Sequence, residues 1–149
     1  MSILSNYPVI HEQVVAWGDM DAFGHVNNVI YYRYIESARI AYFDQLNIFE
    51  ENVLPLVASN QCKYLKPVFY PDRLKVAVRV EEMRDSAMRM HYVLYSEQLQ
   101  HVVATAEAVI VCVDKVEMKK ALIPEQIRKS IIGLELSVQH DLNLKDNQD

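Results

Sequence analysis

The apolar residues of this chain change their spacing near residue 47, from a helical period to a strand period, and this change limits the folds open to it. Between residues 28 and 47, apolar and aromatic residues recur every three or four positions, which predicts one long helix capped by Asn27 or Asn28. Four apolar runs of strand length follow, separated by short polar or proline-containing gaps, at residues 54–64, 74–83, 88–96 and 102–114. Because parallel strands need long crossovers, such short gaps predict antiparallel pairing.

Two further segments complete the predicted domain, one before the helix and one after the last strand. Residues 9–17 are mostly apolar and rich in valine, which predicts a first strand. Pro124 opens a short helix over residues 125–136, since proline suits the first turn of a helix. We therefore predict a single α+β domain over residues 1–138, in which a five-stranded antiparallel sheet packs on one long helix. Residues 139–149 are expected to form a polar, frayed tail.

Composition and charge argue against several classes of partner. A net charge of -5 over 149 residues, with no basic stripe, argues against nucleic-acid binding. No apolar run approaches the roughly 20 residues that span a bilayer, and the first residues lack the basic and apolar regions of a signal peptide. Cys62 and Cys112 show no metal-ligand spacing and do not make a disulfide framework. We therefore expect a cytoplasmic protein that binds neither nucleic acid nor membrane.

Polar residues crowd the loop in front of the predicted helix, where chemistry is often placed. Asp19 and Asp21 lie in this loop, and a carboxylate beside a helix N-terminus stays ionised because the helix dipole favours the anion. Such a carboxylate can attack an activated carbonyl or deprotonate a water molecule. The backbone N–H groups of residues 26–28 have no acceptor inside the helix and can hold a developing oxyanion. Gly24 permits either a close ligand approach or a positive φ.

This set of groups suits a thioester better than an amide. It supplies a carboxylate and backbone donors but no obvious acid for a leaving group. A thiolate, whose conjugate thiol has a pKa of about 8.5, leaves without such an acid, whereas an amine or an alkoxide needs one.

The loop and the helix together carry the motif D-x-D-x-x-G-H-V-N-N-x-x-Y-x-x-Y-x-E-x-A-R over residues 19–39. This motif resembles the signature of the hotdog-fold acyl-CoA thioesterases of the 4-hydroxybenzoyl-CoA thioesterase type, and a looser similarity extends over residues 9–135. The resemblance implies a hotdog fold, with the sheet wrapped around the long helix, and an acyl-CoA substrate. It also implies that subunits pair their sheets edge to edge, with active sites between them, in a homodimer or a homotetramer built as a dimer of dimers.

The resemblance assigns roles to individual residues of this chain. Asp21 matches the catalytic carboxylate, as nucleophile or general base, and the backbone N–H of Asn28 matches the group that polarises the thioester carbonyl. Arg84 matches one position of a basic turn that holds coenzyme A phosphates in some members, although an acid follows it here; Lys66 and Arg73 are alternatives. The other residues expected to shape the substrate site are Gly24, His25, Val26, Asn27 and Tyr31. No cofactor is expected.

Alternative interpretations accompany this assignment. The loop imitates the start of a calcium site, but Phe23 and Ile30 occupy positions that require oxygen ligands, so no metal is expected. His25 acts either as a base or as a backbone hydrogen-bond partner. Glu36 either pairs with Arg39 on the helix or acts in catalysis, as in another hotdog branch. The alternative functions are a non-catalytic acyl-CoA binding module and, with less support, a hotdog hydratase acting on enoyl thioesters. Coenzyme A and acyl carrier protein are both open as carriers of the acyl group.

Overall fold

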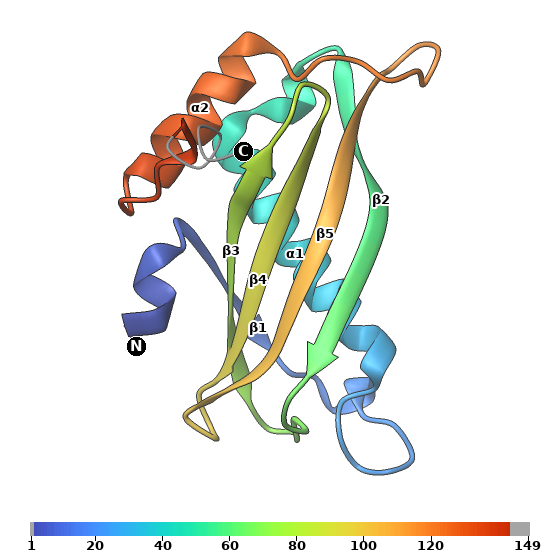
Figure 1. The fold of residues 1–149 in the computed structure, drawn as a ribbon. Coiled ribbons are helices and arrows are strands. Elements are labelled where there is room, and N and C mark those ends of the chain that lie inside the picture. Colours follow the sequence, from blue (N-terminus) through green and yellow to red (C-terminus); the bar gives the residue numbers. More distant parts are fainter. Residues whose placement is uncertain (1, 144–149) are drawn as a thin grey trace.

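The computed structural model of the chain describes residues 2–143, which form a five-stranded antiparallel sheet and two α-helices (Figure 1). The strands are β1 (Val9–Val14), β2 (Val53–Tyr64), β3 (Arg73–Met83), β4 (Ala87–Ser96) and β5 (His101–Asp114), and the helices are α1 (Asn28–Leu46) and α2 (Glu125–Leu136). Short 3₁₀ helices lie at η1 (Ser2–Asn6), η2 (Trp17–Asp19) and η3 (Ile48–Glu50). The strand order is β1-β3-β4-β5-β2, so β1 and β2 are the edges. The predicted α+β architecture is confirmed.

Helix α1 runs along one face of the sheet, and its sequence explains both of its ends (Figure 1). Of the two predicted caps, Asn27 is the one used: its side chain accepts a hydrogen bond of 3.0 Å from the Val29 N–H. Asn47 ends the helix in the left-handed conformation, with φ 55° and ψ 33°. Between these caps, the predicted stripe turns toward the sheet and is buried; it includes Tyr31, Tyr34, Ile35, Ala38, Tyr42 and Phe43. The cap thus fixes the start of α1 beside the polar loop.

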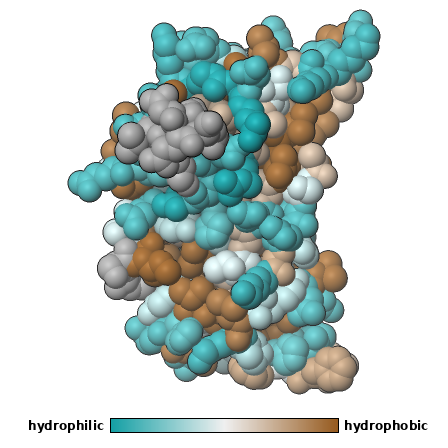
Figure 2. Space-filling view, in the orientation of Figure 1, coloured by the Kyte–Doolittle hydropathy of each residue, from teal (hydrophilic) through white to brown (hydrophobic). Residues whose placement is uncertain are grey.

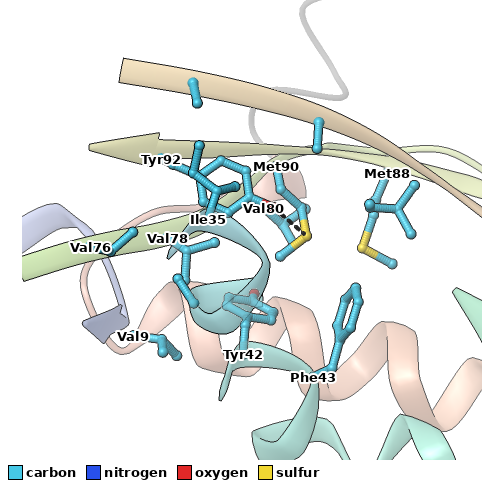
Figure 3. Close-up of a cluster of buried hydrophobic side chains, with 14 of the residues drawn as sticks. Val9, Ile35, Tyr42, Phe43, Val76, Val78, Val80, Met88, Met90 and Tyr92 are labelled. Atoms are coloured by element: carbon cyan, nitrogen blue, oxygen red, sulfur yellow. Dashed lines mark hydrogen bonds between the residues drawn. The ribbon is translucent and has the colours of Figure 1, made fainter. Parts of the chain in front are cut away.

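Apolar side chains from both layers fill the space between α1 and the sheet. Figure 3 shows Tyr42 and Phe43 of α1 on the side of this core that faces Val78, Met88 and Met90 of the sheet. Each of these five side chains is at most 3% exposed. Burying a large apolar side chain stabilises a fold by roughly 1.5–3 kcal/mol, so this packing holds α1 firmly on the sheet. The start of α1 therefore keeps a fixed position relative to the strand ends.

A buried carboxylate anchors α2 to the sheet. Glu135 is 0% exposed and accepts hydrogen bonds from the Tyr42 hydroxyl at 2.6 Å and from the Val80 N–H at 3.0 Å. Nδ1 of His140 lies 2.8 Å from the other carboxylate oxygen. The Val80 N–H can donate to a side chain because the β3–β4 register shifts between Val80 and Glu82. Since a buried polar group needs such partners, this cluster sets α2 at one place on the sheet.

The chain continues to pack beyond α2. Leu142 is 1% exposed and belongs to the hydrophobic core. Residues 144–149 of the predicted tail lie outside the described residues. The domain boundary at residue 138 stays a prediction, with Leu142 packed beyond it.

The sheet has two ends, and the polar loop lies at one of them. Strand β1 finishes at Val14, which pairs with Arg73 at the start of β3, and β2 finishes at Tyr64, which pairs with Ala104. The start of α1 lies at the same end, which we call the loop end (Figure 1). The β3–β4 turn, which contains Arg84, lies at the opposite end.

The surface of the sheet differs between its outer face and its edge. Hydrophilic residues cross the middle of the face opposite α1 (Figure 2), where Arg89 pairs with Glu107 at 2.9 Å. Edge strand β2 is exposed along much of its length and includes Leu56 and Val57, which are 39% and 43% exposed. A long exposed edge offers unpaired backbone groups to another chain. In the part of the chain that the structure describes, no helix has the length and apolar character needed to cross a membrane.

The first strand is shorter than predicted. It ends at Val14, and Trp17 lies in the η2 turn instead of in the strand. The Val15 N–H donates to the Asp72 carbonyl at 3.0 Å, after which the chain turns away from the sheet. Asp19 holds this turn, because its N–H donates to the Ala16 carbonyl and its carboxylate accepts from the Ala16 N–H, both at 3.0 Å.

The predicted ion pair between Glu36 and Arg39 is wrong. Arg39 is 5% exposed and donates a hydrogen bond of 3.2 Å to the Tyr92 hydroxyl inside the core, whereas Glu36 is exposed. Burial raises the pKa of Tyr92, and the Arg39 guanidinium partly opposes this rise. Arg39 therefore belongs to the interface between α1 and the sheet.

Candidate active site

The loop between η2 and α1 is a compact hairpin held by its own backbone. Met20 and Val26 form an isolated antiparallel bridge. The Asp21 N–H donates to the His25 carbonyl at 2.9 Å, and the Gly24 N–H donates to the Asp21 carbonyl at 3.1 Å. Gly24 has φ 88°, which residues with a side chain rarely adopt. A Cβ atom at Gly24 would meet no atom within 4 Å, so the backbone angle, and not a close approach, requires glycine here.

The Asp21 carboxylate uses one oxygen to hold the loop and presents the other beside His25. Oδ1 accepts a hydrogen bond of 2.8 Å from the Phe23 N–H, and Oδ2 lies 3.9 Å from Nδ1 of His25. The His25 ring is stacked with Phe23 at 6.3 Å between centroids and meets Phe69 edge-on at 6.1 Å. The Asp21 side chain is 19% exposed, so Oδ2 keeps limited access to solvent. One carboxylate oxygen is thus left for chemistry in ordered surroundings.

The backbone N–H groups at the start of α1 are not equivalent. The Val26 N–H donates to the Val68 carbonyl at 2.8 Å, and the Asn27 N–H donates to the Asp19 carbonyl at 3.0 Å. The Val29 N–H is taken by the Asn27 cap. For the Asn28 N–H, the described residues provide no hydrogen-bond acceptor. Of the N–H groups predicted to hold an oxyanion, the one at Asn28 is therefore left for a ligand.

A hollow of about 180 Å³ opens beside Asn28 at the loop end. Its lining comes from the loop, from the first turn of α1 and from the end of β2, and consists of His25, Val26, Asn28, Tyr31, Tyr64, Leu65, Lys66 and Pro67. Val26 and Tyr31 are 1% and 2% exposed, so they form its floor. Burial raises the pKa of Tyr31 to about 12, which keeps its hydroxyl protonated. A flexible cation, Lys66, lies at the rim.

The structure brings together most of the predicted site residues but not all of them. His25, Val26, Asn28 and Tyr31 line the hollow. Asp21, Gly24 and Asn27 lie in the supporting loop, with Asp21 connected to the hollow through His25.

Arg84 lies far from this hollow within one chain. Strand β3 has 11 residues and separates Arg84 from the loop end, and a strand advances by about 3.3 Å per residue. Arg84 donates through Nε to Oε1 of Glu82 at 2.6 Å, and this contact lowers the pKa of Glu82. The prediction that Arg84 binds substrate therefore requires a second subunit.

Two tyrosines make contacts in this region that the sequence did not predict: Tyr34, which was expected to pack in the core or line the acyl pocket, and Tyr64, which was expected only as part of a strand. Tyr34 donates a hydrogen bond of 2.5 Å to Asp19. Burial is the largest cause that raises the pKa of Tyr34, and this hydrogen bond is the second. Tyr64 reaches from β2 to the first turn of α1 and donates to the Asn28 carbonyl at 2.9 Å. The Tyr34–Asp19 contact joins two members of the motif, whereas Tyr64 lies 36 residues from Asn28 and outside the motif, which carries no signal for that contact.

Other features of the described residues do not offer the same chemistry. Hollows of about 250 Å³ over β2 and β5 and of about 580 Å³ beside the β4–β5 turn contain no helix N-terminus. Residues 2–143 contain no group of three or more His, Cys, Asp or Glu side chains that could hold a metal ion. The start of α1 therefore remains the best candidate for an active site.

One protein family matches most of the chain. The model of the thioesterase-like superfamily matches residues 15–131. This match includes the polar loop, α1 and strands β2 to β5.

Individual proteins are also similar. The Bacillus subtilis (strain 168) protein YsmA is 34% identical over 90 residues, which is 59% of this chain and 61% of that protein, so the match spans less than two thirds of the relative. The acyl-CoA thioester hydrolase YbgC of Escherichia coli O6:H1 is 26% identical over 122 residues, 76% of this chain and 87% of that protein. A thioesterase from Thermus thermophilus, crystallised with coenzyme A and zinc, has a TM-score of 0.77 and 31% identity, and the match covers 87% of this chain and 96% of that one.

Proposed function

The chain belongs to the thioesterase-like superfamily, and on this basis we propose that it is an acyl-CoA thioester hydrolase with its active site at the start of α1. The predicted membership of the hotdog thioesterases is confirmed, and so is the hotdog architecture. The substrate, the catalytic residues and the assembly are the proposed parts.

The observation that carries the proposal is the Asn28 N–H, which lacks an acceptor among the described residues and belongs to a residue that lines a hollow. A thioester carbonyl bound there would receive this hydrogen bond as negative charge develops on its oxygen. A positioned donor of this kind typically contributes about 10²–10³ in rate. The dipole of the 19-residue helix α1 adds to the attraction of its first turn for negative charge.

Asp21 supplies the second part of the chemistry through Oδ2. As a general base, Oδ2 takes a proton from water while the water oxygen bonds to the carbonyl carbon. The tetrahedral oxyanion then collapses, the carbon–sulfur bond breaks, and the electron pair leaves with sulfur as a thiolate. As a nucleophile, Oδ2 itself bonds to the carbonyl carbon, the thiolate leaves, and water then hydrolyses the mixed anhydride. Neither route needs an acid for the leaving group, because the thiolate is a stable anion.

The remaining predicted residues have supporting roles in this proposal. Gly24 permits the loop turn, Asn27 caps α1, and Val26 and Tyr31 form the floor of the hollow. His25 lies between Asp21 and the hollow, where it can orient Oδ2 or a water molecule. These contacts support the proposed roles.

We propose that a second copy of the chain completes the site. Two exposed β2 edges that pair antiparallel would extend the sheet and place the loop end of one subunit beside the opposite end of the other. The partner subunit's Arg84 would then come near the hollow, where it could hold phosphates of coenzyme A, with Lys66 as a further cation. The assembly is a homodimer or a dimer of dimers. A cytoplasmic setting fits the free thiols of Cys62 and Cys112.

The catalytic assignment is tested with Asp21→Asn in a thiol-release assay on a panel of aliphatic and aromatic acyl-CoAs and acyl carrier proteins. We expect the variant to keep its fold and its acyl-CoA affinity while losing nearly all turnover. Glu36→Gln, which alters an exposed carboxylate on α1, is the matched control and should keep wild-type turnover. Unchanged turnover by Asp21→Asn would contradict the assignment. Tight acyl-CoA binding without thiol release by the wild type would favour a non-catalytic binding module.

A further inference from the structure

Tyr64 closes the gap between edge strand β2 and the start of α1. Its hydroxyl donates to the carbonyl of Asn28 at 2.9 Å, so the side chain spans from the last residue of β2 to the first residue of α1. The N–H of the same Asn28 is the proposed oxyanion donor. The acyl group of a bound thioester would therefore lie directly beside the Tyr64 ring.

The buried Tyr31 packs against the Tyr64 ring. Its ring meets the Tyr64 ring edge-on, with 4.9 Å between centroids. Tyr31 is 2% exposed and belongs to the hydrophobic core. Within one chain, the hollow that these rings line measures about 180 Å³, whereas pockets that enclose drug-sized ligands measure about 300–1,000 Å³. The space beside Asn28 therefore suits a compact acyl group.

Small side chains lie behind the Tyr64 ring. Cys62 is two residues earlier on β2, so it shares a face of the strand with Tyr64, and it packs against the core. Across the β2–β5 pairing, the residues opposite Tyr64, Cys62 and Asn60 are Ala104, Ala106 and Ala108. Removing the Tyr64 ring would leave the hollow facing this row of small residues.

We infer that Tyr64 sets the upper length of the acyl group, so that the site takes short acyl thioesters and turns away long linear chains. This inference rests on the proposed function, because it names the substrate class of the same site. Tyr64 acts by shape: its ring blocks the route between α1 and β2, and its bond to Asn28 holds the ring in place. Tyr64 is a specificity-determining residue and takes no part in the chemistry.

The test measures kcat/KM for acetyl-, butyryl-, octanoyl- and palmitoyl-CoA with three variants and the wild type. The wild type should prefer the two shorter substrates by about tenfold or more, since misfit in an apolar pocket typically changes kcat/KM by about 10–200-fold. Tyr64→Ala should raise the octanoyl-to-butyryl ratio by about tenfold or more. Tyr64→Phe keeps the ring and should keep the short-chain preference. Tyr95→Ala removes a tyrosine packed at the other face of the sheet and should leave the ratio unchanged.

The possible outcomes distinguish a failure of the inference about Tyr64 from a failure of the proposed thioesterase function. Thiol release by the wild type with a preference for palmitoyl-CoA would overturn the inference while leaving the thioesterase function intact. An unchanged chain-length ratio in folded Tyr64→Ala would do the same. If Tyr64→Ala does not fold, the dependence of kcat/KM on chain length in the wild type and in Tyr64→Phe still tests the inference. Both proteins must prefer the short substrates, and a long-chain preference in either would overturn it. Absence of thiol release from every acyl-CoA would contradict the proposed function itself.

Discussion

The Tyr34 hydroxyl donates a 2.5 Å hydrogen bond to Oδ2 of Asp19, which joins the buried face of α1 to the loop in front of it. The same carboxylate oxygen accepts from the Ala16 N–H at 3.0 Å. The Asp19 carbonyl accepts from the N–H of Asn27, the helix cap, at 3.0 Å. Asp19 therefore ties the η2 turn, the cap and the interior of α1 together, two residues before Asp21.

We expect Tyr34→Phe to loosen this loop while the core stays packed. Losing a hydrogen bond to a charged group lowers the free energy of unfolding by about 1.5–3 kcal/mol. Because small displacements of catalytic groups are costly, kcat should fall by about 10- to 100-fold. Calorimetry and thiol release measure the two effects. Tyr95→Phe, which loses a hydroxyl bonded to Gln100 at 3.2 Å, should leave kcat unchanged. Wild-type kcat in folded Tyr34→Phe would show that the tie does not position the loop.

The two glycines Gly24 and Gly133 should respond in opposite directions to alanine. Neither has an atom within 4 Å of an added Cβ, so space is available at both. Gly24 has φ 88°, and Gly24→Ala should lower the free energy of unfolding by about 1–2 kcal/mol. Gly133 lies inside α2, and Gly133→Ala should raise the free energy of unfolding by about 0.5–1 kcal/mol. Denaturant titration measures both values, and a shift of the same sign in the two variants would contradict the backbone explanation.

His91 should make the fold less stable in mild acid. Its Nδ1 lies 2.7 Å from the Tyr7 hydroxyl, and burial lowers the pKa of His91 below 6.5, although the Glu81 carboxylate opposes this shift. The unfolded chain then binds the proton more readily than the folded chain, so stability falls as pH drops through about 6.5. The free energy of unfolding should therefore decrease between about pH 7.5 and pH 5.5. His91→Gln should make this decrease in the free energy of unfolding smaller. An equal decrease in the wild type and in His91→Gln would show that His91 does not cause it.

Much of the architecture follows from local patterns. Strands β2 to β5 each begin one residue before the predicted start, and α2 has the predicted bounds, because period and turn residues act over a few positions. The Asn27 cap is equally local, since its side chain bonds the N–H two residues ahead. The prediction of a strand as far as Trp17 was wrong because Asp19, which was expected only as an acid of the following loop, bonds back to Ala16 and closes the η2 turn.

The site depends on contacts that a local pattern does not contain. The motif indicates several free N–H groups, but only the fold shows that Val68 and Asp19 occupy two of them and leave Asn28. Tyr64 arrives from β2, and Arg84 is carried to the other end of the sheet by the length of β3. Tertiary pairing, which the spacing of residues does not encode, decides each of these placements.

The Asn28 N–H can be removed with little disturbance to the helix. Asn28 is the first residue of α1, where proline is tolerated because that N–H has no acceptor inside the helix. Asn27 has φ -62° and ψ 137°, the extended conformation that a residue before proline prefers. Asn28→Pro also keeps the carbonyl that accepts from Tyr64. Asn28→Ala is the matched control, because it removes the side chain and keeps the N–H.

The most direct measurement is kcat for thiol release by the wild type, Asn28→Ala and Asn28→Pro, with the thermal midpoint of each. If the Asn28 N–H holds the oxyanion, Asn28→Ala keeps kcat close to the wild-type value. Asn28→Pro then loses about 10²–10³ in kcat with an unchanged thermal midpoint. Wild-type kcat in Asn28→Pro would contradict the assignment of the start of α1 as the oxyanion site.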